Sequence, residues 1–281
     1  SRHFGGCMSE RVDLAMVRLG LAPTRERARA LVMAGVVYVD GRRVDKAGAP
    51  VSDGATIDVR EDPMPFVSRG GLKLQKALQV FPIDLTGAFA LDIGASTGGF
   101  TDCMLQNGAG HVCAIDVGYG QLDWKLREDA RVTVMERTNA RYMMPDWFSQ
   151  LAKFASIDVS FISLRLILPP LWPCLADGGE VVALIKPQFE AGRAEVGKRG
   201  VVRDPAVHAD VCDGIIRFAD GMGFAVRGLS YSPITGPKGN IEFLLYLQKS
   251  SDRPPIPEMT SIQAIVSEAH ARALGHPSTG S

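Results

Sequence analysis

The 281-residue sequence has no long hydrophobic run, no paired cysteine motif and no net charge. No apolar stretch approaches the roughly 18 residues that cross a bilayer, and residues 1–8 contain no apolar core of a signal peptide. The five cysteines form no Cys-x-x-Cys pair and no metal-ligand spacing, which argues against the common zinc motifs. These absences predict a cytoplasmic protein with reduced thiols, no metal and no membrane partner, in which residues 1–8 form a leader outside the folded domains.

The zero net charge hides an uneven distribution along the chain. Residues 1–76 hold 13 Lys and Arg against 9 Asp and Glu, whereas residues 77–281 hold 18 against 22. A basic part on an acidic remainder is typical of proteins in which one part binds phosphates. The pattern therefore favours a nucleic-acid partner for the N-terminal part.

The most informative segment is Leu91–Asp102, LDIGASTGGFTD. It predicts a short buried strand, a glycine-rich turn and the start of a helix. The glycines follow the pattern G-x-x-x-G-G instead of the dinucleotide pattern G-x-G-x-x-G. This spacing better fits the nucleoside-binding loop of enzymes that use S-adenosylmethionine (SAM), and a glycine-rich turn without a ligand is the alternative. The expected cofactor contacts in this segment are Asp92, Gly94, Ser96, Thr97, Gly98, Gly99 and Phe100.

Strand and helix patterns alternate through the larger C-terminal part. Seven strands are expected at residues 89–93, 111–117, 131–136, 154–159, 180–185, 223–229 and 241–248. This alternation predicts an α/β domain with the seven-stranded, Rossmann-like sheet of SAM-dependent methyltransferases. The expected division is a small α+β domain at 9–61, a proline-containing linker at 62–67, the sheet domain at 68–249 and a tail with a short helix at 250–281.

Ligands of such sheets bind beyond the carboxyl ends of the strands, and several polar residues are expected at that edge. Asp116 ends the second strand, where a carboxylate can hold ribose hydroxyls, and Asn139 follows the third strand at the height of the adenine. Asp158 ends the fourth strand, bordering the SAM pocket, and Lys186 directly follows the fifth. In SAM-methyltransferase sheets the last strand runs antiparallel, so Glu242, near its start, is expected at the same edge.

Lys73, at the entry of a preceding helix, is expected to be the fourth charged residue of the group. Two lysines and two carboxylates beside a SAM pocket suit methylation of a ribose 2′-hydroxyl, a poor nucleophile that must lose its proton as it attacks. A lysine can act as the base only when it is neutral, and a neighbouring cation with partial burial favours that form. Lys186 is therefore the candidate base and Lys73 the second cation, with Asp158 and Glu242 orienting the amines.

The N-terminal part predicts two short helices followed by a hairpin. Helical spacing over residues 12–19 and 24–34, with Thr24 as an N-cap, precedes a hairpin whose turn is Asp40-Gly41. The side chains expected to contact RNA phosphates are Arg11, Arg18, Arg25, Arg29, Arg42 and Arg43, with Arg69 beyond the linker. A solvated basic helix face is the alternative interpretation.

Two resemblances follow from these motifs. The segments Arg11-x-Asp13, Thr24-Arg25-x-x-Ala28 and Gly35-x-Val37-x-Val39-Asp40-Gly41 resemble the small RNA-binding domain first seen in a protein of the small ribosomal subunit. The remainder resembles the hemolysin-A-like (TlyA) family of ribosomal RNA 2′-O-ribose methyltransferases, whose catalytic domain is related to the FtsJ type. The segments that carry this second resemblance are Ser68–Leu74, Leu91–Asp102, Asp116–Leu122, Asp158–Leu164, Ile185–Glu190, Gly200–Asp204 and Gly239–Glu242.

The TlyA resemblance implies a catalytic tetrad of Lys73, Asp158, Lys186 and Glu242, with SAM as methyl donor. It also implies that the targets are cytidines of ribosomal RNA within ribosomal subunits.

Three other functions remain open from the sequence. The segment 158–161, Asp-Val-Ser-Phe, partly matches the D-P-P-Y type loop of base N-methyltransferases, but it lacks both prolines. A non-catalytic RNA-binding factor is the second alternative, and the four charged residues argue against it. A membrane-lytic protein is the third, suggested by the family's historical name, and the lack of a signal peptide or membrane span argues against it.

Overall fold

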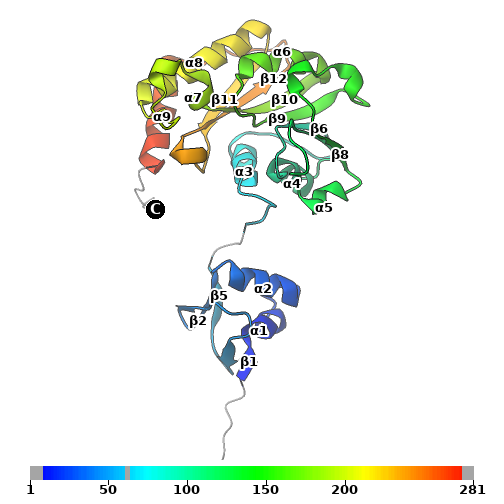
Figure 1. The fold of residues 1–281 in the computed structure, drawn as a ribbon, viewed down its shortest axis with the longest axis vertical. Coiled ribbons are helices and arrows are strands. Elements are labelled where there is room, and N and C mark those ends of the chain that lie inside the picture. Colours follow the sequence, from blue (N-terminus) through cyan, green and yellow to red (C-terminus); the bar gives the residue numbers. More distant parts are fainter. Residues whose placement is uncertain (1–8, 61–63, 274–281) are drawn as a thin grey trace, which may run out of the picture. The chain divides into compact units, whose positions relative to one another are not determined.

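The computed structural model describes residues 9–60 and 64–273. The chain divides into two compact units, with the division between Pro65 and Phe66 (Figure 1). The expected leader at 1–8, part of the expected linker, and the last residues of the expected tail lie outside the described residues.

The first unit is a small α+β domain. Its elements are β1 (Ser9–Arg11), α1 (Val12–Arg18), α2 (Arg25–Met33), β2 (Val37–Val39), β3 (Arg42–Arg43), β4 (Pro50–Ser52) and β5 (Ile57–Val59). A three-stranded sheet has the order β3-β2-β5, and β1 pairs with β4 separately. Thr24 caps α2 as predicted, because its hydroxyl accepts a hydrogen bond from the Arg27 amide. The sequence pattern does not reveal β1 and β4, since three-residue strands are too short to show an alternation.

The second unit is built on a seven-stranded sheet. Its strands are β6 (Phe89–Ile93), β7 (His111–Ile115), β8 (Val132–Met135), β9 (Ala152–Ile157), β10 (Leu175–Ile185), β11 (Ala225–Tyr231) and β12 (Phe243–Gln248). They lie in the order β11-β12-β10-β9-β6-β7-β8. The five strands from β10 to β8 are parallel, whereas β12 runs antiparallel to both of its neighbours. The predicted fold class, a Rossmann-like sheet with a small α+β domain before it, is confirmed.

Helices cover both faces of this sheet (Figure 1). On one face lie α3 (Gly71–Val80), α4 (Gly99–Gln106) and α5 (Trp124–Arg127). On the other face lie α6 (Leu168–Leu171), α8 (Pro205–Met222) and α9 (Met259–Ala273). The short helix α7 (Pro187–Glu190) directly follows the end of β10. None of the helices in the described residues is long and apolar enough to cross a membrane.

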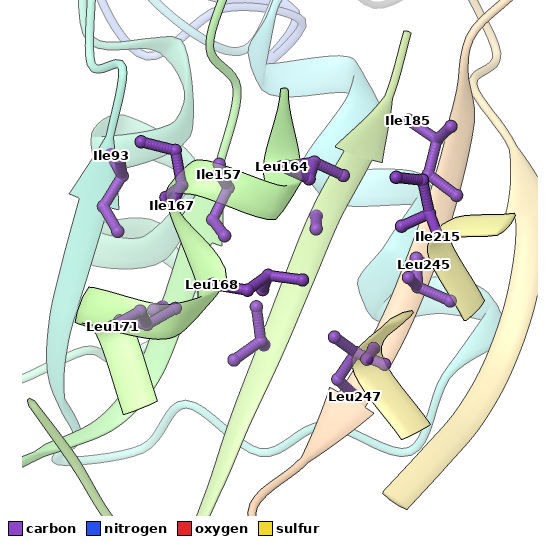
Figure 2. Close-up of a cluster of buried hydrophobic side chains, with 14 of the residues drawn as sticks. Ile93, Ile157, Leu164, Ile167, Leu168, Leu171, Ile185, Ile215, Leu245 and Leu247 are labelled. Atoms are coloured by element: carbon purple, nitrogen blue, oxygen red, sulfur yellow. The ribbon is translucent and has the colours of Figure 1, made fainter. Parts of the chain in front are cut away.

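The core reaches the tips of the parallel strands. Figure 2 shows Ile93, Ile157 and Ile185 within one buried cluster; each is the last residue of its strand and is fully buried. Ile115, the last residue of β7, is equally enclosed. Buried apolar side chains at these positions fix where each strand leaves the sheet. The residues that follow them are Gly94, Asp116, Asp158 and Lys186.

A histidine pair joins α9 to α8. His208 Nε2 lies 2.8 Å from the Val202 carbonyl oxygen, and His208 Nδ1 lies 2.8 Å from His270 Nε2. The neutral pair satisfies both contacts when His208 donates to Val202 and accepts from His270. Burial lowers the pKa of His208 and of His270, although the nearby Asp204 opposes the shift in both.

This pair should make the protein sensitive to acid. A histidine whose folded pKa is lowered stabilises the fold above its unfolded pKa of about 6.5, and that stability is lost as the pH falls below this value. The His270→Gln variant keeps a donor for His208 but cannot be protonated there. Its melting temperature should therefore fall less than that of the wild type between about pH 7 and pH 5, measured by calorimetry. An equal fall in both proteins would show that the pair does not control acid stability.

Candidate functional site

A cavity of about 560 Å³ lies beyond the carboxyl ends of β6, β7 and β9. Its volume falls within the range of small-molecule and cofactor sites. Five of the residues expected to bind a cofactor line this cavity: Gly94, Ser96, Asp116, Asn139 and Asp158. Gln121, Thr138, Ser160 and Phe161 line it as well, and none of these four was among the expected cofactor contacts. Each lies in a loop that follows a strand of the sheet. Their position after a strand end is the feature of the sequence that could have identified them.

The glycine loop brings backbone close to the cavity. Gly94 has a φ of +84°, and a Cβ atom there would lie 2.0 Å from the carbonyl oxygen of Asp158. Gly98 has a φ of +99°, and a Cβ atom there would lie 2.3 Å from a methyl carbon of Leu126. No other residue fits either position without rearrangement. The glycine spacing read from the sequence therefore has a steric cause on both sides of the loop.

Asp116 connects the glycine loop to the loop after β7. Its Oδ2 accepts a hydrogen bond of 2.7 Å from the Ser96 amide, and its Oδ1 accepts one of 2.7 Å from the Gly118 amide. A carboxylate oxygen has room for further donors beyond one amide. The half-buried Asp116 can therefore hold the two hydroxyls of a ribose while keeping both loops in place.

Asp92 has a different environment. Its side chain is fully buried beneath the loop, where Oδ2 accepts a hydrogen bond of 2.7 Å from the Thr101 hydroxyl and Oδ1 lies 3.5 Å from Ser156 Oγ. Burial raises the pKa of Asp92 to about 7. Asp92 lies outside the cavity lining, and so do four of the other expected contacts: Thr97, Gly98, Gly99 and Phe100. These five residues would affect a bound cofactor indirectly, because they set the shape of the loop and the start of α4.

The four charged residues expected at the sheet edge form two ion pairs. Lys73 Nζ lies 2.6 Å from Glu242 Oε1, and Lys186 Nζ lies 2.5 Å from Asp158 Oδ1. The β10–β12 register pairs Ile185 with Phe243, which brings Lys186 beside Glu242 on adjacent antiparallel strands. The strand topology therefore brings Asp158, Lys186 and Glu242 to one edge, and Lys73 joins them from α3 through its contact with Glu242. Asp158 also lines the cavity.

Both lysines are buried, with side chains 9% and 8% exposed for Lys73 and Lys186. A buried charge is costly unless it is paired and hydrogen-bonded. Lys186 Nζ has a second contact, 3.3 Å to the Ser160 hydroxyl, and Glu242 accepts a further hydrogen bond of 3.1 Å from Gln188 Nε2. The arrangement provides an amine that can exchange a proton, held in place by a carboxylate and a hydroxyl.

Hydrogen bonds and a ring contact join the loops after β9 and β10. Glu190 accepts hydrogen bonds from the Ser163 hydroxyl and the Leu164 amide, at 2.6 and 2.8 Å. The Phe161 and Phe189 rings lie 4.9 Å apart between their centres. Phe161 is 89% exposed and has a φ of +63°, a conformation that a bulky residue rarely adopts. These contacts hold the exposed Phe161 ring beside the cavity.

Six of the seven arginines expected to bind RNA lie in the first unit, and they differ in their surroundings. Arg11 and Arg25 contact the fully buried Asp13 at 3.0 and 3.2 Å, and the hydrogen bond from Arg11 contributes most to lowering the pKa of Asp13 to about 2. These two side chains therefore also stabilise the small domain.

The remaining expected arginines lie at the surface. Arg18 pairs with Glu10 and Arg43 with Asp45. Arg29, Arg42 and Arg69 are exposed, with Arg69 in the second unit. Within residues 9–60 and 64–273, no group of three His, Cys, Asp or Glu side chains has the geometry to hold a metal ion.

The sheet order, the glycine loop and the cavity at the strand ends define a SAM-dependent methyltransferase. SAM fits the residues present, because Gly94 and Ser96 of the loop line the cavity together with Asp116 and Asn139, which offer polar atoms to a nucleoside. Residues 66–249 match the FtsJ-like methyltransferase family, and residues 10–57 match the S4 domain. The chain belongs to the FtsJ-like methyltransferase family and carries an S4 domain before its catalytic domain.

Known proteins resemble the chain over most of its length. The Bacillus subtilis protein YqxC is 54% identical over 265 residues, covering 93% of this chain and 94% of that protein. The 16S/23S rRNA (cytidine-2′-O)-methyltransferase TlyA of Mycobacterium tuberculosis is 46% identical over 244 residues, covering 86% of this chain and 91% of that protein. A solved structure from Streptococcus thermophilus has 52% identity and a TM-score of 0.72, covering 95% of this chain and 97% of that one.

Two aspartates of the site should differ in their effect on SAM. The Asp116→Ala variant should lower SAM affinity by about tenfold or more, because charge-assisted hydrogen bonds to a ribose are lost. The Asp92→Asn variant should bind SAM nearly as well as the wild type, because Asn can still accept from the Thr101 hydroxyl and can donate to Ser156 Oγ. Titration calorimetry measures both affinities, and a large loss in Asp92→Asn alone would reverse the two roles.

Asp92 should instead control stability at alkaline pH. A carboxyl whose folded pKa is raised stabilises the fold below its unfolded pKa of about 4, and that stability is lost as the pH rises through about 7. The Asp92→Asn variant cannot ionise at this position. Its melting temperature should therefore decrease less than that of the wild type between pH values of about 6 and 8.5.

Proposed function

We propose that the protein methylates the ribose 2′-hydroxyl of a cytidine in ribosomal RNA. The observation that carries the proposal is the pair of lysine–carboxylate contacts at the edge of the SAM cavity. The similarity to a TlyA protein named for this reaction supports the choice of nucleotide and RNA. Expected partners are therefore ribosomal subunits, which is consistent with a cytoplasmic location.

Bound SAM supplies an electrophilic methyl group. Lys186, in its neutral form, would take the proton of the 2′-hydroxyl as the oxygen attacks. Asp158 and Ser160 hold the Lys186 amine at the cavity, at 2.5 and 3.3 Å. Lys73 adds a second positive charge at this edge of the sheet, and Glu242 keeps the Lys73 amine in position.

The reacting 2′-hydroxyl must reach the cavity, so the target nucleotide has to leave its ordinary position in the RNA. Phe161 offers an exposed aromatic face beside Ser160 and the cavity. Unstacked bases of single-stranded RNA stack on such side chains. Phe161 thus supports a substrate in which the target nucleotide is turned out of its stack, and its contact with Phe189 holds the ring in place.

The S4 domain would supply affinity for the RNA. Its exposed arginines, Arg29 and Arg42 among them, are suited to contact phosphates, which position a protein without reading base sequence. Arg69, at the start of the catalytic unit, would extend the basic surface.

A base N-methyltransferase is the second candidate, and the segment 158–161 favours it in part. That chemistry does not need a lysine to take a proton from a hydroxyl, so it leaves the buried Lys186 and Lys73 without a role. Alkaline hydrolysis of RNA after reaction with SAM distinguishes the two: a 2′-O-methyl group blocks cleavage at its nucleotide, whereas a base methyl group does not. Uniform cleavage of methylated RNA would reject the ribose proposal.

The Lys186→Arg variant should lose the reaction while retaining SAM. Guanidinium stays protonated and cannot accept the hydroxyl proton, so kcat should fall by about 10²–10⁴, the usual contribution of a general base. Methyl transfer from radiolabelled SAM measures kcat, and a fully active Lys186→Arg enzyme would contradict the base role.

The Arg29→Glu and Arg42→Glu variants should weaken RNA binding in a salt-dependent way. Each lost phosphate contact reduces the slope of log affinity against log salt by roughly 0.7–0.9. Lys153→Glu, an equal charge reversal at an exposed position of the catalytic unit, is the matched control and should leave the slope unchanged. Arg25 is unsuitable for this test because its loss would also uncover the buried Asp13. Unchanged slopes in both arginine variants would place the RNA surface elsewhere.

A further inference from the structure

One buried polar atom beside the two ion pairs lacks a partner. Among the described residues, Gln188 Oε1 is the only buried side-chain nitrogen or oxygen atom with no hydrogen bond. Buried polar groups without partners are rare in folded proteins, and each calls for an explanation. Gln188 lies two residues after Lys186, in α7.

The other half of the same carboxamide explains its orientation. Gln188 Nε2 donates a hydrogen bond of 3.1 Å to Glu242 Oε2, while Lys73 Nζ holds the opposite oxygen, Oε1. Turning the carboxamide over would give its oxygen a new position, but it would also set that oxygen against a carboxylate oxygen. The hydrogen bond from Gln188 Nε2 to Glu242 therefore fixes the orientation of the carboxamide. In that orientation Oε1 has no partner.

Glu242 has little other freedom. It is 1% exposed, and the backbone of Gly236 lies so close that a Cβ atom there would be 2.3 Å from Glu242 Oε2. One oxygen of the carboxylate thus meets a cation, and the other meets a neutral donor in a confined space. The donor at residue 188 therefore sets the orientation of the Glu242 carboxylate. The position of the Lys73 amine follows from that orientation.

We infer that Gln188 is a positioning residue for methyl transfer, which orients Glu242 and thereby Lys73. This inference rests on the proposed ribose methylation. An apolar residue of similar size would remove the unpartnered acceptor, but it would also take from the buried Glu242 Oε2 the donor that Gln188 supplies, which is costly for a charged group. The gain from glutamine lies in the orientation of the charged pair. Gln188 also joins the loop that carries Lys186 to the start of β12, which couples the two ion pairs.

The test uses the full chain, ribosomal subunits and radiolabelled SAM, with three variants. Gln188→Leu removes the donor at similar size. Gln188→Glu keeps the shape but sets a second carboxylate against Glu242. Gln79→Leu, at an exposed position near the end of α3, is the matched control. SAM affinity, the KM for RNA, kcat and the melting temperature are measured for each.

The Gln188→Leu variant should lose about tenfold or more in kcat, the scale of one hydrogen bond to a charged group. Its SAM affinity and its KM should stay close to those of the wild type and of Gln79→Leu. The deficit of Gln188→Glu, relative to the wild type at the same pH, should shrink as the pH is lowered, because a proton shared between two carboxyls restores a donor to Glu242. The deficit of Gln188→Leu should not change with pH.

Three outcomes would overturn the inference. One is a wild-type kcat in Gln188→Leu. Another is a kcat loss in both Gln188 variants that is independent of pH and accompanied by a lowered melting temperature, which indicates a purely structural role. If Gln188→Leu does not fold, the pH dependence of Gln188→Glu decides alone, and a constant deficit rejects the inference. A wild-type enzyme that leaves no hydrolysis-resistant nucleotide would instead reject the proposed ribose methylation.

Discussion

The edge of the sheet that carries the candidate site depends on the burial of the last side chain in each parallel strand. Ile93, Ile115, Ile157 and Ile185 are enclosed by the core, and the next residue in each case belongs to the site. A close-packed core allows little displacement of such side chains. Loops that begin at fixed points can hold polar groups at fixed distances, which chemistry at the sheet edge requires. β12 runs antiparallel, so its first residue lies at this edge. There Glu242 comes before the fully buried Phe243 in the sequence.

Buried charge is the second constraint, and both units use it. In the catalytic unit, two buried lysines are each paired with a carboxylate, because a buried charge without a partner is costly. In the small domain, Asp13 is buried and is neutralised by Arg11 and Arg25. Arginines that the sequence associates with RNA thus also hold a fold together. A basic surface and a stable small domain share some of the same side chains.

The two aspartates near the glycine loop illustrate how burial divides similar residues between roles. Both belong to sequence segments that resemble cofactor-binding motifs. Asp116 stays partly accessible and holds two loop amides, whereas Asp92 lies beneath the loop and contacts two hydroxyl groups. The first is suited to contact a nucleoside and the second to support the turn that contacts it. Burial is the largest cause that raises the pKa of Asp92, and the nearby Asp158 and Asp116 carboxylates add to it.

The sequence by itself determined the seven strands of the large sheet and the edge at which the candidate site lies, but not the short strands β1 and β4. Hydrophobic runs, glycine spacing and helix caps are local features, and the alternation of strands and helices leaves few ways to assemble a sheet. The four charged residues could be assigned to one edge because each adjoins a strand end or the start of a helix. Contacts between distant residues required the tertiary structure: the pairing of Lys73 with Glu242, the donor from Gln188, the histidine pair between α8 and α9, and the burial of Asp92. Each of these depends on strand register and helix packing, which bring together side chains far apart in the chain, and no local pattern encodes those distances.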